Sequence, residues 1–447
     1  MYLTLNVALI SLGCAKNLID SEVMLKLLYD NNYKLVKELG LADIIIINTC
    51  GFIESAKQES INTIIEMAQY KSSGRCKVLI ATGCLSERYN KELLEELPEL
   101  DAVIGTGDYK SIDKVINKTL MGEKVLLYGN QETVDINNLD RYIQTGNYTA
   151  YLKIAEGCDN KCTYCVIPSI RGNYRSRRFD DIIKEANILG QRGIKEIIVI
   201  AQDITMYGKD LYGELKLPKL LKEIAAIKEI EWIRLMYTYP DEFSDELISV
   251  IASEDKICKY LDIPIQHASN HMLKRMGRRT SKENIFNLIN KLKKEVPMIA
   301  LRTSLIVGFP GEKEEDFEEL LDFIKQVKFD RLGVFTYSRE ENTPAYNMKN
   351  QIEYEVKLQR QEMIMQSQMD ISLEKNTEFI GKTLKVLVEG FDDGQYFGRS
   401  YRDAPEIDGL VYFNSKRSIN IGEFCEVLIT EALEYDLMGE NANEYSK

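Results

Sequence analysis

Short hydrophobic runs alternate with amphipathic stretches through the first 124 residues of the chain. The runs are NVALISLG, ADIIIINTC, CKVLIATGC and DAVIGTG. Such runs predict buried strands, and the alternation is typical of a parallel sheet covered by helices. We therefore predict an N-terminal open parallel α/β sheet over residues 1–124. A polar linker with little structure of its own follows over residues 125–145.

The same alternation resumes over residues 146–375, where six strand candidates can be counted. They are TAYLKIAEG, IKEIIVIAQD, EWIRLMYTYP, KYLDIPIQH, ALRTSLIVGFPG and DRLGVFTYSR, with amphipathic helical patterns between them. Six units are too few for the eight strands of a closed barrel. This part of the chain therefore predicts an open, partial (β/α)6 barrel, which ends in one long polar helix over residues 351–375.

The pattern changes again after residue 375. The segments KTLKVLVEG, QYFGRSYRD, GLVYFN and EFCEVLITEAL are short strand candidates punctuated by glycine. They predict a small all-β domain, an OB-like barrel, over residues 376–441. The fold class is thus α/β, with two α/β domains followed by a small β-barrel.

The composition restricts the chemistry that this chain can perform. No stretch approaches the roughly 20 apolar residues of a membrane span, and the N-terminal segment has neither a basic leader nor a cleavage site. We therefore expect a cytoplasmic protein with no membrane partner, whose thiols stay reduced. Nine cysteines in such a chain indicate metal or redox chemistry, whereas two histidines leave little material for imidazole catalysis.

Three cysteines lie close together directly after the first strand of the middle domain. Cys158, Cys162 and Cys165 form a CxxxCxxC motif in the segment GCDNKCTYC. Three thiolates in one loop suit an iron–sulfur cluster with one open iron, whereas zinc needs a fourth ligand. The alternative is a loop that is merely rich in cysteine. A zinc site from His267 and His271 lacks a third ligand.

A second group of cysteines follows the strands of the first domain. Cys14, Cys50 and Cys84 each stand at the carboxyl end of a predicted strand. Those ends of a parallel sheet line one crevice, so the three thiols can converge and hold an auxiliary cluster. The alternative is that they are buried structural thiols, as free cysteines usually are. Cys76, Cys258 and Cys425 share no such placement, and we interpret them as structural.

These motifs carry a resemblance to known families. The CxxxCxxC motif with Tyr164 before its last cysteine resembles the radical S-adenosylmethionine (SAM) superfamily. The resemblance extends to methylthiotransferases, which have an N-terminal methylthiotransferase domain, a radical SAM domain and a C-terminal TRAM domain. It rests on the segments SLGCAKNLIDSE, NTCGFIESAKQES, ATGCLSER, GCDNKCTYCVIPSIRG, YLDIPIQHAS, TSLIVGFPGE and GRSYRDAPEIDG. Four of these segments resemble the members that modify the small-subunit ribosomal protein S-twelve.

The resemblance implies a reaction and its cofactors. It implies that an aspartate of protein S-twelve receives a methylthio group on its β-carbon, with two 4Fe-4S clusters and two SAM molecules. One SAM donates a methyl group and the other is cleaved to a 5′-deoxyadenosyl radical. The implied partners are protein S-twelve or the small ribosomal subunit, an electron donor such as flavodoxin or ferredoxin, and a sulfur donor.

SAM should contact residues at the carboxyl ends of the barrel strands, because the loops there face a bound cofactor. Apart from the cluster ligands, we assign no catalytic side chain. The alternative for each predicted contact is an ordinary hydrogen-bonded structural role. The predicted contacts are Tyr164, Gln202, Asp203, Gln266, His267, Arg302 and Ser304.

Charge discriminates between possible substrates. The chain carries a net charge of −13, and its residues from 376 onward contain 14 acidic against 7 basic residues. A domain that grips tRNA should present positive charge to phosphates, so this one better suits a basic ribosomal protein. Two alternatives remain: a tRNA adenosine methylthiotransferase with the same clusters, and a non-catalytic iron–sulfur electron carrier or scaffold.

Overall fold

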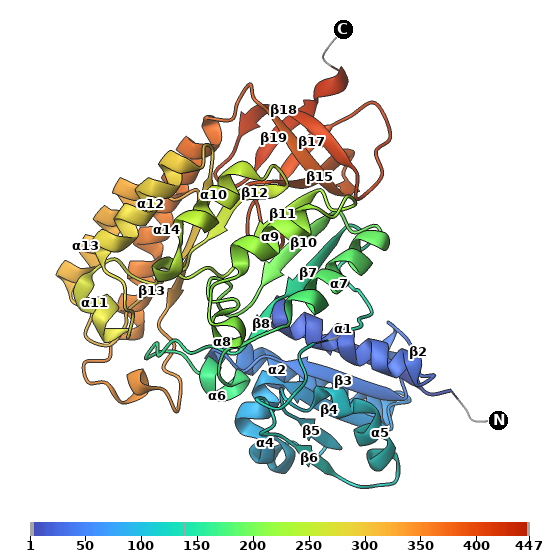
Figure 1. Ribbon diagram of the computed structural model, residues 1–447. Coiled ribbons are helices and arrows are strands. Elements are labelled where there is room, and N and C mark those ends of the chain that lie inside the picture. The colour runs from blue at the N-terminus through green and yellow to red at the C-terminus, as the bar shows by residue number, and fades with distance from the viewer. Residues whose placement is uncertain (1–3, 138, 445–447) are drawn as a thin grey trace.

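The computed structural model describes residues 4–137 and 139–444, which form three parts in chain order (Figure 1). The first part contains a six-stranded parallel sheet in the order β2-β1-β3-β4-β5-β6. Its strands are β1 (Asn6–Ser11), β2 (Lys34–Leu35), β3 (Ile44–Thr49), β4 (Val78–Gly83), β5 (Ala102–Ile104) and β6 (Val125–Leu127). Its helices are α1 (Ala15–Asp30), α2 (Glu54–Ala68), α3 (Tyr70–Ser73), α4 (Cys84–Glu96) and α5 (Ile112–Leu120).

The central strand β3 explains why this sheet lies between layers of helices. All six of its residues are buried, and its isoleucines contribute alternately to two hydrophobic clusters, one on each face. A continuous β-branched run of this kind is typical of a parallel strand covered on both sides. The predicted open α/β sheet is confirmed.

The expected linker is more structured than its polar composition suggests. Val125–Leu127 forms β6, which pairs with β5 at the edge of the first sheet. The prediction that residue 125 begins an unstructured segment is therefore wrong, because this apolar triplet buries Val125 against the sheet. Further along, the buried Arg141 binds Glu22 of α1 at 2.6 Å and Glu185 of α7 (Phe179–Gln191) at 2.6 Å.

The middle part is an open six-stranded parallel sheet, as predicted, in the order β14-β13-β12-β11-β10-β7. Its strands are β7 (Thr149–Lys153), β10 (Glu196–Ile200), β11 (Trp232–Leu235), β12 (Ile257–Asp262), β13 (Ala300–Val307) and β14 (Arg331–Thr336). A short antiparallel pair stands apart, formed by β8 (Ala155–Glu156) and β9 (Arg175–Ser176).

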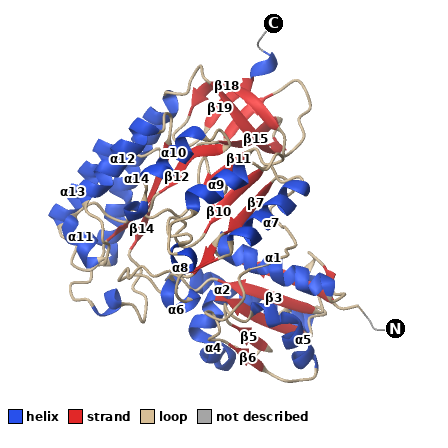
Figure 2. Ribbon diagram, in the orientation of Figure 1, coloured by secondary structure: helices blue, strands red, loops and turns tan. Residues whose placement is uncertain are grey.

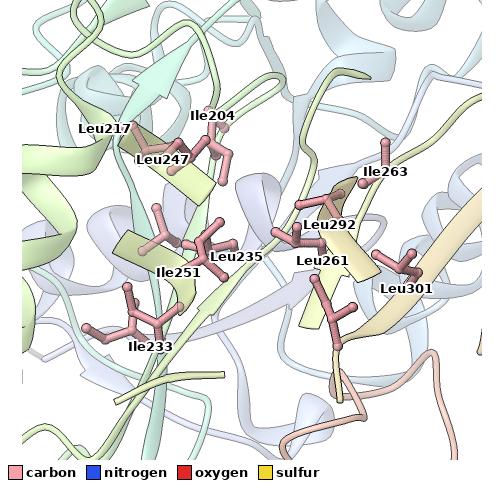
Figure 3. Close-up of a cluster of buried hydrophobic side chains, with 14 of the residues drawn as sticks. Ile204, Leu217, Ile233, Leu235, Leu247, Ile251, Leu261, Ile263, Leu292 and Leu301 are labelled. Carbon is pink, nitrogen blue, oxygen red and sulfur yellow. The ribbon is translucent and has the colours of Figure 1, made fainter. Parts of the chain in front are cut away.

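Helices cover the outer face of this sheet (Figure 2). They are α7, α9 (Leu217–Ala225), α10 (Asp245–Ser253), α12 (Lys282–Glu295), α13 (Glu314–Val327) and α14 (Tyr354–Thr377). Three short helices lie at the loops: α6 (Ile167–Arg171) beside α4, α8 (Lys209–Tyr212) beside β9, and α11 (Asn270–Arg275). Figure 3 shows the core between the layers, where Ile233 and Leu235 of β11 pack with Ile251 of α10. The other face of the sheet carries charged residues, among them Lys153 and Arg302.

The last part is a closed β-barrel of five strands in the order β15-β16-β17-β19-β18. They are β15 (Thr383–Asp392), β16 (Gln395–Ser400), β17 (Val411–Asn414), β18 (Phe424–Ala432) and β19 (Leu437–Asn441). The small all-β domain is confirmed. Strand β19 had no clear hydrophobic signal, because its inward residues are Leu437, Gly439 and Asn441 and leucine is the only large apolar one.

The loop between β16 and β17 inserts into the amino ends of the middle strands. Arg399 of β16 binds Glu196, the first residue of β10, at 2.5 Å. Arg234 of β11 binds the same glutamate at 2.8 Å and donates to the carbonyl of Tyr401 at 2.6 Å. The loop itself contributes Asp403, which meets Arg331 of β14 at 2.6 Å. We call residues 399–409, the end of β16 together with most of this loop, the plug.

Buried charges also join the first part to the middle part. Asp20 of α1 binds Lys153 of β7 at 2.8 Å and Arg171 of α6 at 2.6 Å. Lys153 also binds Glu156 of β8 at 2.6 Å. We call Asp20, Lys153, Glu156 and Arg171 the Asp20 network. In the described part of the chain, no helix is both long and apolar enough to cross a membrane.

The plug makes a testable contribution to stability. Replacing Arg399 with alanine leaves Glu196 with only Arg234 as a charged partner, and breaking a buried pair in this way costs about 3 kcal/mol. We expect Arg399→Ala to lower the midpoint of thermal unfolding by several degrees at pH 7. Lys416→Ala, at an exposed position of the same barrel, is the control and should melt like the wild type.

The difference in thermal midpoint between Arg399→Ala and the wild type should shrink in acid. Burial alone would raise the pKa of the Glu196 carboxyl, but Arg399 and Arg234 outweigh burial and lower that pKa to about 2. The ion pair therefore stabilises the fold fully above the unfolded-state pKa of about 4.3 and loses its effect as the pH falls toward 2. Equal melting of Arg399→Ala and wild type at pH 7 would contradict this role.

Candidate functional site

The CxxxCxxC cysteines lie in the loop between β8 and α6. Burial raises the pKa of Cys158 to about 11 and that of Cys165 to about 12. The charge of Cys162 raises both values further, so the three thiols lie within electrostatic range of one another. Because Cys158 and Cys165 are protonated when their pKa values are this high, iron binding by these two sulfurs has to release protons.

Main-chain contacts hold this loop against the segment that follows α11. The amide of Thr163 donates to the carbonyl of Met276 at 2.9 Å, and the Thr163 hydroxyl donates to the carbonyl of Arg275 at 2.9 Å. Gly277 has φ +72°, and a Cβ at that position would lie 2.6 Å from the carbonyl oxygen of Lys161. Glycine is therefore required at position 277, where the segment after α11 packs against the cysteine loop.

The first-domain cysteines converge at the carboxyl edge of their sheet, as predicted. Cys14 precedes α1, Cys50 follows β3 and Cys84 is the first residue of α4. Gly13 has φ +83°, and a Cβ there would lie 3.1 Å from the Cys50 Sγ. Burial raises the pKa of Cys84 to about 12, and the charges of Cys14 and Cys50 act in the same direction.

Arg171 of the middle part contacts the first-domain cysteine group, and sequence analysis did not single it out. It ends α6, the short helix that follows Cys165, and it is only 3% exposed. Its Nη2 lies 3.4 Å from the Cys84 Sγ and also donates to the Asn17 Oδ1. Its one sequence signal is its place six residues after the CxxxCxxC motif. A fixed positive charge therefore stands beside the first-domain thiols.

The donor types at both places fit iron–sulfur clusters. Within residues 4–137 and 139–444, no three His, Cys, Asp or Glu side chains are grouped as ligands of a single metal ion. A cubane cluster does not require its thiolates to meet at one metal ion, because each thiolate binds a different iron atom. Two sets of three thiols, each without a fourth cysteine, match clusters with one open iron.

The two histidines have protein partners instead of a shared zinc site. His267 is fully buried, and its Nδ1 accepts a hydrogen bond from the amide of Ser269 at 3.0 Å. His271 lies on α11 and binds Asp316 of α13 at 2.9 Å. The structure offers no support for the zinc alternative.

Two of the predicted SAM contacts lie directly after β10. The Gln202 side chain donates to Glu156 at 2.5 Å, and its buried Oε1 has no hydrogen-bond partner among the described residues. Asp203 accepts from the Thr205 amide at 3.0 Å and from Asn160 of the cysteine loop at 3.1 Å. Burial raises the pKa of the Asp203 carboxyl. Asp203 therefore ties the cysteine loop to the sheet.

Three more predicted contacts, Gln266, Arg302 and Ser304, are half-buried, and Arg302 lies in the amino half of β13, where it also reaches Asp408 of the plug at 3.4 Å. Gln266 has φ +69°, a conformation rare for any residue except glycine, and its amide donates to the carbonyl of Ser304 at 2.9 Å. Arg302 binds Asp262 at 2.8 Å and the Ser304 hydroxyl at 3.2 Å. Strained, hydrogen-bonded residues of this kind concentrate at functional sites.

Tyr164 of the cysteine loop packs against the segments that follow β13 and β14. Its ring meets the edge of Phe309, with ring centroids 6.5 Å apart and planes at 86°. Phe309 in turn packs on Tyr337 in a small cluster with Met272 and Met276. This cluster anchors the loop between its second and third cysteines.

Comparisons with known proteins agree with this division of the chain. Residues 6–105 match the family described as uncharacterized protein family UPF0004, residues 152–324 match the radical SAM superfamily, and residues 380–441 match the TRAM domain. The fold resembles that of the radical SAM methyltransferase TsrM from Kitasatospora setae. The TM-score is 0.56 at 13% identity, over 87% of this chain and 79% of that chain.

Full-length relatives are much closer in sequence. A protein of Thermoanaerobacter sp. (strain X514), named ribosomal protein uS12 methylthiotransferase RimO, is 55% identical over 97% of this chain and 99% of its own length. A protein of the same name from Clostridioides difficile (strain 630) is 54% identical over 98% of both chains. The chain therefore belongs to the RimO family of radical SAM methylthiotransferases.

Proposed function

We propose that this enzyme adds a methylthio group to the β-carbon of an aspartate of ribosomal protein uS12. The observation that carries the proposal is the grouping of three cysteines within each of two domains, with Arg171 of the second domain in contact with Cys84 of the first. The names of the full-length relatives supply the substrate. Two SAM molecules would serve, one as methyl donor and one as source of the 5′-deoxyadenosyl radical.

The residues divide between two 4Fe-4S clusters. Cys158, Cys162 and Cys165 would hold the cluster that binds SAM, and Cys14, Cys50 and Cys84 would hold the auxiliary cluster. These cofactors supply the radical chemistry that an unactivated C–H bond requires and that no side chain can supply. The contribution of the chain is to hold both centres and the target side chain close together.

The polar residues at the strand ends support binding of SAM. Gln202, after β10, has an unsatisfied buried oxygen, and Gln266, after β12, and Ser304 of β13 are half-buried polar residues of the same sheet. We assign these residues and Arg302 to SAM or to its immediate surroundings. We assign Tyr164, Asp203 and His267 to positioning, because each is held by the protein contacts described above.

Charge supports a basic protein substrate over tRNA. Two of the basic residues of the C-terminal barrel, Arg399 and Arg402, are buried in the plug and present no charge at the surface. The surface of this acid-rich domain is therefore poorly suited to phosphates and complementary to a basic protein.

The reaction also needs an electron donor, such as flavodoxin or ferredoxin, and a source of sulfur. All nine cysteines are free thiols, which supports a reducing cytoplasmic environment. Both donors and this location are part of the proposal.

The substrate is tested by mass spectrometry of uS12 after incubation with the reconstituted enzyme, SAM, a reductant and a sulfide source. We expect a gain of one methylthio group on an aspartate. A tRNA pool in a parallel reaction is the control and should remain unmodified. Modified tRNA with untouched uS12 would reassign the enzyme to tRNA.

The role of the CxxxCxxC motif is tested by Cys162→Ala. In the presence of SAM and reductant, the wild type should release 5′-deoxyadenosine and the variant should release none, because the cluster loses a ligand. Cys425→Ala, in the core of the C-terminal barrel, is the matched control and should retain the activity. A wild type that forms no 5′-deoxyadenosine would support the electron-carrier alternative.

The auxiliary centre is tested by Cys50→Ala. We expect this variant to bind about half as much iron as the wild type, since one of two equal clusters is lost. Cleavage of SAM should continue while methylthiolation of uS12 stops. Cys76→Ala, in the core of the first domain, should keep its full iron content. Unchanged iron in Cys50→Ala would remove Cys50 from the ligand set.

A further inference from the structure

Several cationic side chains lie near the boundary between the first part and the middle sheet, among them Lys16 and three others, Lys153, Arg171 and Arg302. Lys153, Arg171 and Arg302 are neutralised by carboxylates at short distance. Lys153 and Arg171 share Asp20, and Arg302 binds Asp262 at 2.8 Å and Asp408 of the plug at 3.4 Å. None of these three has a free positive charge to offer to a ligand.

Lys16 differs from the other three. It lies in the first turn of α1, two residues after Cys14, and is only 8% exposed. It interacts electrostatically with Cys14 of its own domain and with Glu156 and Asp262 of the middle part, so its ammonium lies between the two domains. Among residues 4–137 and 139–444, no side chain or carbonyl forms a hydrogen bond or ion pair with that ammonium.

The nearest group to the Lys16 ammonium is the ring of Tyr237, whose centroid lies 3.0 Å from Nζ. Tyr237 follows β11 with φ +63°, which is strained for an aromatic residue. Its amide donates to Asp262 at 3.2 Å, and its carbonyl accepts from the Ile204 amide at 3.1 Å. The middle domain thus holds the face of the Tyr237 ring under the ammonium of Lys16, which is a cation–π contact. The N–H groups of that ammonium have no hydrogen-bond acceptor among the described residues.

We propose that Lys16 binds the side-chain carboxylate of the substrate aspartate. The inference rests on the proposed function, in which the reacting β-carbon is bonded directly to that carboxylate. A carboxylate that enters a buried site needs a cation as partner, and the Lys16 ammonium, which lies over the Tyr237 ring, has no carboxylate within ion-pair distance among the described residues. An ion pair with Lys16 orients the β-carbon between the two sets of thiols, and Lys16 determines the preference for aspartate over asparagine.

The test compares two forms of purified uS12: the natural protein and a form with asparagine in place of the modified aspartate. We expect the wild-type enzyme to bind the aspartate form at least about 30-fold more tightly, measured as Kd by fluorescence anisotropy. Lys16→Met removes the charge but keeps the length of the side chain, and it should bind both forms equally weakly. Lys16→Arg should recover a preference for aspartate.

Lys26→Met, on the same helix, is the matched control and should discriminate like the wild type. Retention of the full aspartate preference by Lys16→Met would overturn the inference. Loss of iron from Lys16→Met would also overturn it, since Lys16 would then support the thiol site and not the substrate. If the wild-type enzyme fails to modify uS12, the proposed function is wrong. If the wild type modifies uS12 and Lys16→Met modifies it with an unchanged KM for uS12, only this inference is wrong.

Discussion

The arrangement of both thiol sites depends on the buried Asp20 network. Asp20 comes from the first domain, whereas Lys153, Glu156 and Arg171 come from the second, and all four side chains are at most 6% exposed. Removing one member would leave charges without compensation in a place that water does not reach, which is strongly unfavourable. The network therefore holds α1 and its neighbouring Cys14 against the strand and helix that flank the CxxxCxxC loop.

The amino ends and the carboxyl ends of the strands in the middle sheet have different roles. At the amino ends of its strands, Glu196 and Arg331 are occupied by the plug. At the carboxyl ends, polar groups such as the Gln202 Oε1 have no protein partner in the described part of the chain. Parallel strands place all their carboxyl ends together, so the sheet collects ligand-binding groups on one side and leaves the other side for domain packing.

The sequence was sufficient for features that depend on local pattern and strand direction. The CxxxCxxC loop is local, and Cys14, Cys50 and Cys84 could be brought together because the hydrophobic runs before them predict strands of one parallel sheet. Arg171 and Lys16 could not be singled out. A buried arginine or lysine has the same sequence appearance as an exposed one, and partners such as Arg171 and Asp20 are 151 residues apart. The plug segment carries a family motif that the sequence reveals, but its packing role depends on the docking of two domains.

The plug also sets how the C-terminal barrel can behave toward a large partner. Arg399 and Arg402 are nearly inaccessible, and their ion pairs cross the boundary to the middle sheet. Rotation of the barrel against the middle sheet would have to break these buried ion pairs. The ion pairs therefore fix the distance between the barrel surface and the thiol sites, which is the distance that a partner bound to both would have to bridge.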